Sequence, residues 1–323
     1  MTTEKKNSFW SKCYSFWFPQ KKDTTKQKIG KIISLVALVI LIFSLIMLAL
    51  LLFKYIKANS ISNSYHDLYV SSTTSSQIKK AEDLFDSETG VIKELSQLYK
   101  VNNDLIGHIN IPNTRLNYPI VKGKDNQYYL TNTLYKKYDP FGVPFADYRS
   151  TITKETQSTN ITVYGHSAQD GSFFATVKKY KDFSFYQEHP IIEFDTIYGK
   201  GTYKIIGFFM EDVSQQNKKV FSYHDFIDVN SDKDVIRFLE NVAKRSYFKT
   251  GVDAISSDQF ITLSTCDTEV NKTDFRVALV ARKVREGEST EVDISKSEKN
   301  AKPMMPARWY QKKGIEDPFS KER

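Results

Sequence analysis

One continuous apolar segment near the N-terminus limits what this chain can fold into more than any other feature. Residues 32–53 contain no charged side chain, and about 22 helical residues at ~1.5 Å each span ~33 Å, enough for the ~30 Å hydrocarbon core of a membrane. A cleavable signal peptide has only ~7 to 15 apolar residues before a small-residue cleavage site, and no such site follows Phe53. The sequence therefore predicts one uncleaved transmembrane helix over residues 32–53.

Basic residues are distributed unevenly about this segment, and that asymmetry predicts its orientation. Only Lys54 and Lys57 follow it closely, whereas eight lysines precede it, namely Lys5, Lys6, Lys12, Lys21, Lys22, Lys26, Lys28 and Lys31. Because positively charged flanks stay on the cytoplasmic side, we expect residues 1–31 to be a cytoplasmic basic leader and the body to be extracellular. The rest of the net charge of +8 suits a domain beside anionic envelope polymers or lipid headgroups, with nucleic-acid binding as the less favoured interpretation.

The chain has two cysteines, and the predicted membrane separates them. Cys13 precedes the apolar segment and Cys266 lies far beyond it, so the two cannot pair within one chain. A lone cysteine in an exported domain indicates intermolecular pairing or a reactive thiol, whereas a cysteine at a strand end is as often a small buried apolar residue. The absence of other cysteines predicts a body that relies on its core for stability.

The rest of the chain shows many short strand patterns and few helical ones. Residues 59–76 are rich in Ser, Thr and Asn and predict a spacer, and residues 77–99 predict two short helices around Gly90, either a stalk or packed on the body. Strands are expected at 105–112, 116–121, 161–164, 191–194, 203–209, 260–266 and 275–280, and a helix at 231–247 with Ser231 as its N-cap. We therefore divide the chain into a spacer with short helices (54–100), a mainly β, barrel-like body (101–285) and a charged, largely disordered tail (286–323).

Three side chains with complementary chemistry are predicted at strand ends. The strand at 260–266 ends in Cys266, and the chain returns as a strand that carries Arg276. His166 follows the strand at 161–164, so its imidazole is also expected at a sheet edge. A thiol of ordinary pKa ~8.5 needs a neighbouring base or cation to act as a nucleophile, and the carboxylate of Asp267 would oppose the thiolate. The other histidines are expected to be structural or at the surface, namely His66, His108, His189 and His224.

The residues around these positions resemble one known family. Thr262-Leu263-Ser264-Thr265-Cys266 matches the TLxTC signature of sortases, with an arginine ten positions later and a Tyr-Gly-His triplet at residues 164–166 about a hundred earlier. Pro119-Ile120-Val121 with Gly123, and a helix inserted before the cysteine strand, make the chain similar to class B sortases over residues 101–284. The combination is specific, although each piece alone is not.

The resemblance implies a closed eight-stranded β-barrel with a few peripheral helices, behind a membrane helix on the outer face of a Gram-positive cell. It implies a cysteine transpeptidase in which Cys266 attacks the threonine carbonyl of a C-terminal sorting signal, His166 is the general acid and Arg276 stabilises the oxyanion. The implied partners are a surface or pilin protein with that signal and an amine from a peptidoglycan precursor or a pilin lysine, without nucleic acid. Substrate contacts are implied for Asn126, Leu130, Tyr164 and Ser264, although Asn126 could be a helix cap and Leu130 a core residue.

Two other functional classes stay open on the residues alone. A hydrolytic cysteine peptidase of the papain type would carry its cysteine before its histidine, whereas the order here is His166, Cys266, Arg276. A non-catalytic, membrane-anchored binding protein would make the thiol incidental. We expect no cofactor and no metal, because one cysteine and one isolated histidine fall short of the three or four ligands that zinc requires, and no nucleotide-binding glycine motif is present.

Overall fold

The structure, a computed structural model, describes residues 14–74, 84–168, 171–214, 221–229, 231–269 and 274–322. The chain divides into two compact units, residues 1–60 and 61–323. In the first unit, residues 14–17 are helical and helix α2 (Thr25–Thr74) begins. Thr25–Phe53 is the one described helix long and apolar enough to cross a membrane, with a mean hydropathy of 3.3 over its most apolar window and none of that window buried.

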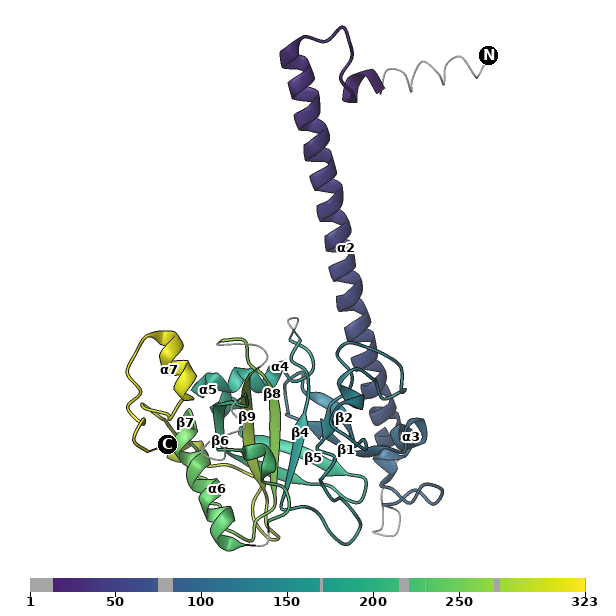
Figure 1. The fold of residues 1–323 in the computed structure, drawn as a ribbon. Coiled ribbons are helices and arrows are strands. Elements are labelled where there is room, and N and C mark those ends of the chain that lie inside the picture. The colour runs from purple at the N-terminus through teal and green to yellow at the C-terminus, as the bar shows by residue number, and fades with distance from the viewer. Residues whose placement is uncertain are drawn as a thin grey trace. The chain divides into compact units, whose positions relative to one another are not determined.

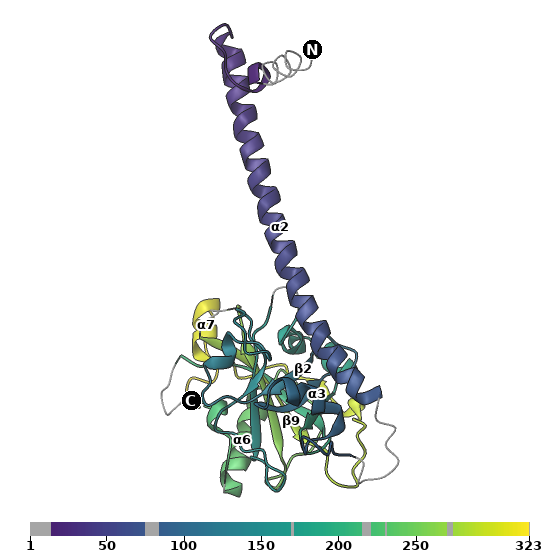
Figure 2. The same ribbon diagram turned by 90° about the vertical axis from the view of Figure 1, so that its right-hand side faces the viewer.

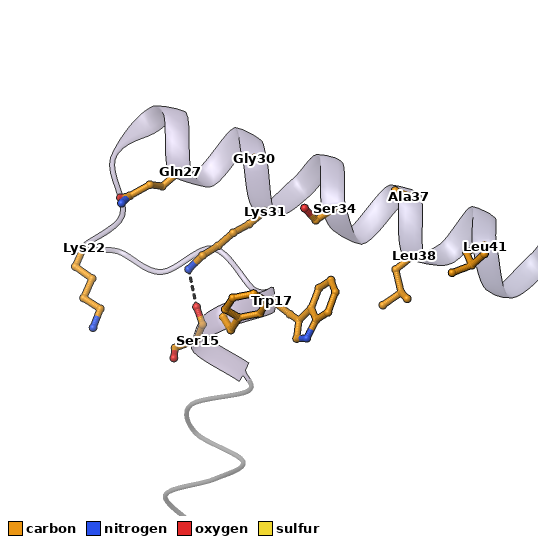
Figure 3. Close-up of a pocket in the computed structure, with 11 residues that line it drawn as sticks. Ser15, Trp17, Lys22, Gln27, Gly30, Lys31, Ser34, Ala37, Leu38 and Leu41 are labelled. Atoms are coloured by element: carbon orange, nitrogen blue, oxygen red, sulfur yellow. Dashed lines mark hydrogen bonds between the residues drawn. The ribbon is translucent and has the colours of Figure 1, made fainter.

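A pocket lies between the short N-terminal helix and α2 (Figure 3). Trp17 faces the apolar side chains of Leu38 and Leu41, and the Lys31 ammonium donates to the Ser15 carbonyl and pairs with Asp23 at 2.7 Å. An aromatic ring and a lysine at the end of an apolar helix are typical of a membrane interface. We therefore assign this pocket no chemistry.

The second unit is built on a closed barrel of eight described strands in the order β1-β2-β3-β4-β8-β9-β6-β5 (Figure 1), and this confirms the predicted fold class. The strands are β1 (Leu105–Asn110), β2 (Asn117–Val121), β3 (Phe145–Ala146), β4 (Asn160–Tyr164), β5 (Ile191–Thr196), β6 (Thr202–Asp212), β8 (Phe260–Cys266) and β9 (Phe275–Lys283). A separate two-stranded sheet pairs β7 (Phe248–Lys249) with β10 (Glu298–Lys299). The helical elements are α3 (Lys93–Val101), η2 (Tyr128–Leu130), α4 (Ala175–Lys178), η3 (Lys179–Lys181), α5 (Phe183–Glu188), η4 (Tyr223–Asp225), α6 (Asp232–Arg245), η5 (Ile294–Lys296) and α7 (Ala307–Lys313).

Strand β8 is apolar along most of its length because both of its faces are covered. It pairs with β4 in parallel and with β9 in antiparallel orientation, and only Cys266 at its end is partly exposed. One face contributes to the barrel interior, and the other packs under α6, whose Phe238 stacks on Phe226 and meets the ring of Phe260. The sequence of a strand that is buried on both faces is a continuous apolar run and not an alternation of apolar and polar residues.

Helix α6 lies close against the barrel wall at β6, on the side away from α3 (Figures 1 and 2). A Cβ on Gly207 would lie 2.6 Å from Cγ1 of Val242, so the helix can approach this closely only over a glycine. The β6–β9 register also shifts between Ile205 and Gly207. The helix predicted at 231–247 is confirmed, although the Ser231 side chain makes no capping hydrogen bond.

The segments before the barrel differ from the expected spacer and pair of helices. Helix α2 continues to Thr74, and its Tyr69 ring stacks on buried His108 with centroids 4.0 Å apart. Residues 75–83, which include part of the first predicted helix, lie outside the described residues. From residue 84 the chain forms a turn with a bridge between Phe85 and Ile92, because Gly90 adopts a positive φ. Helix α3 buries Leu95 and Leu98 in the barrel core, which favours packing over a free stalk.

The C-terminal segment also differs from the expected disordered tail. It contains η5, β10 and α7, and it buries Met304, Met305 and Tyr310 against the body. Its charge suggested disorder, but the charges pair with the body, where Arg308 contacts Asp212 and Asp274 at 3.2 and 3.1 Å. A few buried apolar side chains and ion pairs therefore hold this segment against the body, although its composition alone is typical of a disordered chain.

Candidate active site

The barrel topology brings His166 and Cys266 to one edge. Strands β4 and β8 run in parallel with Tyr164 opposite Ser264. Strand β4 ends two residues before His166, and β8 ends at Cys266. Near these strand ends, Thr265 Oγ1 donates a hydrogen bond of 2.7 Å to the Gly165 carbonyl, which links the two segments. Because parallel strands end on the same side of a sheet, the imidazole and the thiol emerge together although they are a hundred residues apart in sequence.

Arg276 is brought to the same edge by the antiparallel partner. It lies directly opposite Cys266 in the β8–β9 register, and its Nη1 donates to the Phe275 carbonyl at 3.1 Å. The expected neighbourhood of Cys266 and Arg276 is thus present as a cross-strand pair. A nucleophilic sulfur and a planar, cationic set of hydrogen-bond donors therefore share this edge.

All seven side chains predicted to form the site line one pocket of about 210 Å³. The seven are Asn126, Leu130, Tyr164, His166, Ser264, Cys266 and Arg276, and the lining is completed by Phe145, Gly165 and Thr265. Asn126 and Leu130 come from the loop that contains η2 and not from a longer helix. The other histidines are not among the lining residues, and the side chain of His66 lies outside the described part of the chain.

The imidazole of His166 is oriented by the backbone. Its Nε2 lies 3.0 Å from the carbonyl oxygen of Leu130, and because a carbonyl oxygen can only accept, Nε2 carries a proton and donates it. The ring also meets Phe141 edge to face, with centroids 6.4 Å apart. His166 therefore has a proton on the nitrogen that faces the pocket wall.

The carboxylate of Asp267, the one expected to oppose the thiolate, is engaged in an ion pair and a hydrogen bond. It is buried, with Oδ2 at 2.8 Å from the Lys181 ammonium, and its Oδ1 accepts from the Glu269 amide. Successive side chains of a strand point to opposite faces, so this ion pair lies on the face away from Cys266.

Two buried residues that the sequence did not indicate support the pocket. Tyr223 Oη lies 2.7 Å from Ser264 Oγ, and burial raises the pKa of Tyr223 to about 12, an effect that this hydrogen bond and Arg276 only partly offset. Asp147 accepts hydrogen bonds from Tyr164 and Asn126 at 2.9 and 3.0 Å. Neither residue lies in a recognisable motif, so no signal in the sequence would have found them. Among the described residues, no group of three or more His, Cys, Asp or Glu side chains could hold a metal ion.

Comparisons with known proteins find one family. The sortase domain family matches residues 109–284. Sortase B of Staphylococcus aureus is 30% identical over 194 residues, which cover 59% of this chain and 75% of that protein, and sortase B of Listeria monocytogenes is 29% identical over 244 residues, or 76% and 92%. The structure of the S. aureus sortase B–substrate complex aligns with a TM-score of 0.54 and 30% identity, over 60% of this chain and 86% of that one.

A closed barrel with a strand-end cysteine, histidine and arginine, together with these matches, defines a cysteine transpeptidase, and the chain belongs to the sortase family. Within that family it is a class B sortase, because the curated relatives and the structures that it matches are class B enzymes. The matched family region ends at residue 284, so α7 and the segment before it lie beyond that region.

Proposed function

We propose that this sortase is anchored by residues 32–53 with its N-terminus in the cytoplasm and its barrel outside, and that it joins a sorting-signal protein to an amine. The observation that carries the proposal is the cross-strand pair of Cys266 and Arg276, in a pocket that His166 also lines. The acceptor amine belongs to a peptidoglycan precursor or a pilin lysine. The S. aureus relative has been solved as a substrate complex, which supports a peptide in this pocket.

The proposed first half-reaction forms a thioester. The Cys266 thiolate attacks the carbonyl carbon of the threonine in the sorting signal, and the carbonyl oxygen becomes an oxyanion stabilised by the Arg276 guanidinium. The intermediate collapses with cleavage of the peptide C–N bond, and protonated His166 donates its proton to the leaving amine. The Cys266 sulfur then carries the acyl group and His166 is neutral.

The proposed second half-reaction restores the enzyme. The acceptor amine attacks the thioester carbonyl, neutral His166 takes the proton that the amine loses, and the C–S bond breaks to release the Cys266 thiolate. The new amide joins the threonine to the acceptor, so the number of peptide-type bonds is conserved. If water replaced the amine, the same steps would give hydrolysis.

The test uses the full chain in detergent with a library of sorting-signal peptides and an amine acceptor, followed by mass spectrometry. We expect a thioacyl adduct on Cys266, cleavage after threonine, and an amide product that appears only when the amine is present. The Cys266→Ala variant is the control and should form neither product. Only hydrolysed peptide in the presence of the amine would point to a peptidase, and no thiol-dependent product at all would point to a binding protein.

A further inference from the structure

Asp147 is a buried carboxylate behind the pocket wall that the catalytic steps do not use. Its side chain is fully buried, just after β3, and its backbone amide donates to the Thr162 carbonyl of β4 at 2.8 Å. Oδ2 accepts from Tyr164 Oη at 2.9 Å, from Asn126 Nδ2 at 3.0 Å and from Arg149 Nη2 at 2.9 Å. Oδ1 accepts from the Arg149 side chain and backbone. Both oxygens are therefore fully used within the protein.

The carboxamide of Asn126 is hydrogen-bonded at both its nitrogen and its oxygen, by the consecutive residues Asp147 and Tyr148. Its nitrogen donates to Asp147 Oδ2, and its oxygen accepts from the Tyr148 amide at 3.0 Å. Because an ionised carboxylate only accepts and a backbone amide only donates, a reversed carboxamide would face like groups at both ends. Asp147 thus determines which end of the Asn126 amide is presented along the pocket.

The charge of Asp147 is balanced by Arg149, which extends the network to a second part of the pocket. Burial would raise the pKa of the Asp147 carboxyl, but hydrogen bonds from Arg149, Tyr164 and Asn126 outweigh it and hold that pKa below its ordinary value. Arg149 also donates to Asp225 at 3.0 Å and to the His224 carbonyl at 2.7 Å, in the turn whose Tyr223 bonds to Ser264. The network therefore reaches three of the four predicted substrate contacts, namely Asn126, Tyr164 and Ser264.

We propose that Asp147 is a positioning residue for substrate binding, which fixes the Asn126 amide and the Tyr164 hydroxyl in the orientation that receives the sorting peptide. The inference rests on the proposed function, because it assigns a peptide to this pocket. A carboxylate that served only to stabilise the fold would need no contact with two pocket-lining side chains, and its loss would not act on peptide binding in particular.

The test is the isosteric variant Asp147→Asn, measured in the full chain with a sorting-signal peptide and an amine acceptor. Asparagine replaces one accepting oxygen by a donor and removes the charge that Arg149 balances, so the side chain can no longer accept from Tyr164, Asn126 and Arg149 together. We expect KM for the peptide to rise about tenfold or more, with kcat changed less than about threefold, a split that indicates lost substrate binding. The rate at which iodoacetamide alkylates Cys266 should be unchanged, since that small reagent does not use the pocket wall.

Asp258→Asn is the matched control, because Asp258 is also buried and also accepts from an arginine, Arg285, at 2.7 and 2.8 Å, but bonds to no residue that lines the Cys266 pocket. It should leave KM within about twofold of the wild type. The pair Asp147→Asn and Tyr164→Phe should be non-additive, because each removes the same hydrogen bond. Equal loss in kcat and alkylation rate, or fully additive effects, would overturn the proposal.

If Asp147→Asn does not fold, Arg149→Lys takes its place, because it keeps the charge beside Asp147 and loses the planar fork. We expect KM to rise in this variant too, but by less than in Asp147→Asn. An unchanged KM in the Arg149 variant would count against the inference. The two proposals fail differently. A wild-type chain that transfers no peptide contradicts the proposed function, whereas normal transfer with an unaltered KM in the Asp147 variant contradicts only the role of Asp147.

Discussion

At the scale of single residues, the site depends on strand register as well as on the identity of each side chain. Cys266 and Arg276 are cross-strand partners, and directly opposite residues in an antiparallel pair have Cβ atoms ~4.5 to 5.5 Å apart. His166 is placed by the parallel pairing of β4 with β8. A shift of one residue in either pairing would turn its side chain to the other face of the barrel wall, so the three groups meet only because both registers are maintained.

Replacing Arg276 by lysine separates charge from geometry at this site. Lysine keeps the positive charge but lacks the planar set of donors, so we expect acylation by the sorting peptide to fall about 100-fold, the usual effect of losing one oxyanion donor. The pH dependence of Cys266 alkylation should change much less. Single-turnover acylation and alkylation rates measure the two effects, and a Lys variant with the wild-type acylation rate would refute the geometric role of Arg276.

At the scale of elements, α7 holds both ends of the chain segment between β8 and β9. Trp309 Nε1 donates to Glu269 on the side of Cys266, and Arg308 pairs with Asp274 on the side of Arg276. Glu269 also pairs with Lys181 at 2.9 Å. Burial opposes ionisation of Glu269, but the hydrogen bonds from Lys181 and Trp309 prevail and lower its pKa to about 2.

The lowered pKa of Glu269 predicts how this contact depends on pH. A carboxyl group whose pKa is depressed in the folded state stabilises the protein above its ordinary pKa of 4.5 and loses that contribution as the pH falls toward about 2. We therefore expect Glu269→Gln to lower the Tm at pH 6, and the difference from wild type to shrink below pH 4.5. Circular dichroism melts over this range provide the measurement, with exposed Glu316→Gln as a control. A Tm difference that stayed constant down to pH 2 would contradict the assignment.

At the scale of the whole molecule, the two cysteines report the proposed topology, because Cys13 precedes the apolar helix and Cys266 follows it. In intact cells, a small membrane-impermeant methanethiosulfonate should modify the Cys13→Ser variant, in which Cys266 remains. It should modify the Cys266→Ala variant only after the membrane is permeabilised. Mass spectrometry of the labelled chain gives the readout, and the opposite pattern would place the barrel in the cytoplasm.

The sequence by itself determined the apolar segment, the strand-rich body and the three reactive residue types, because each is a local pattern of hydropathy or a short motif. Only the tertiary structure decided which distant groups meet. The Asp147 carboxylate, the Tyr223 hydroxyl and the Lys181–Asp267 pair join residues far apart in sequence, and no local periodicity marks them. Helix α7 is ordered by contacts that its charged composition conceals. Hydrophobic periodicity reports burial along one element, whereas the hydrogen bonds that orient a pocket depend on how separate elements pack.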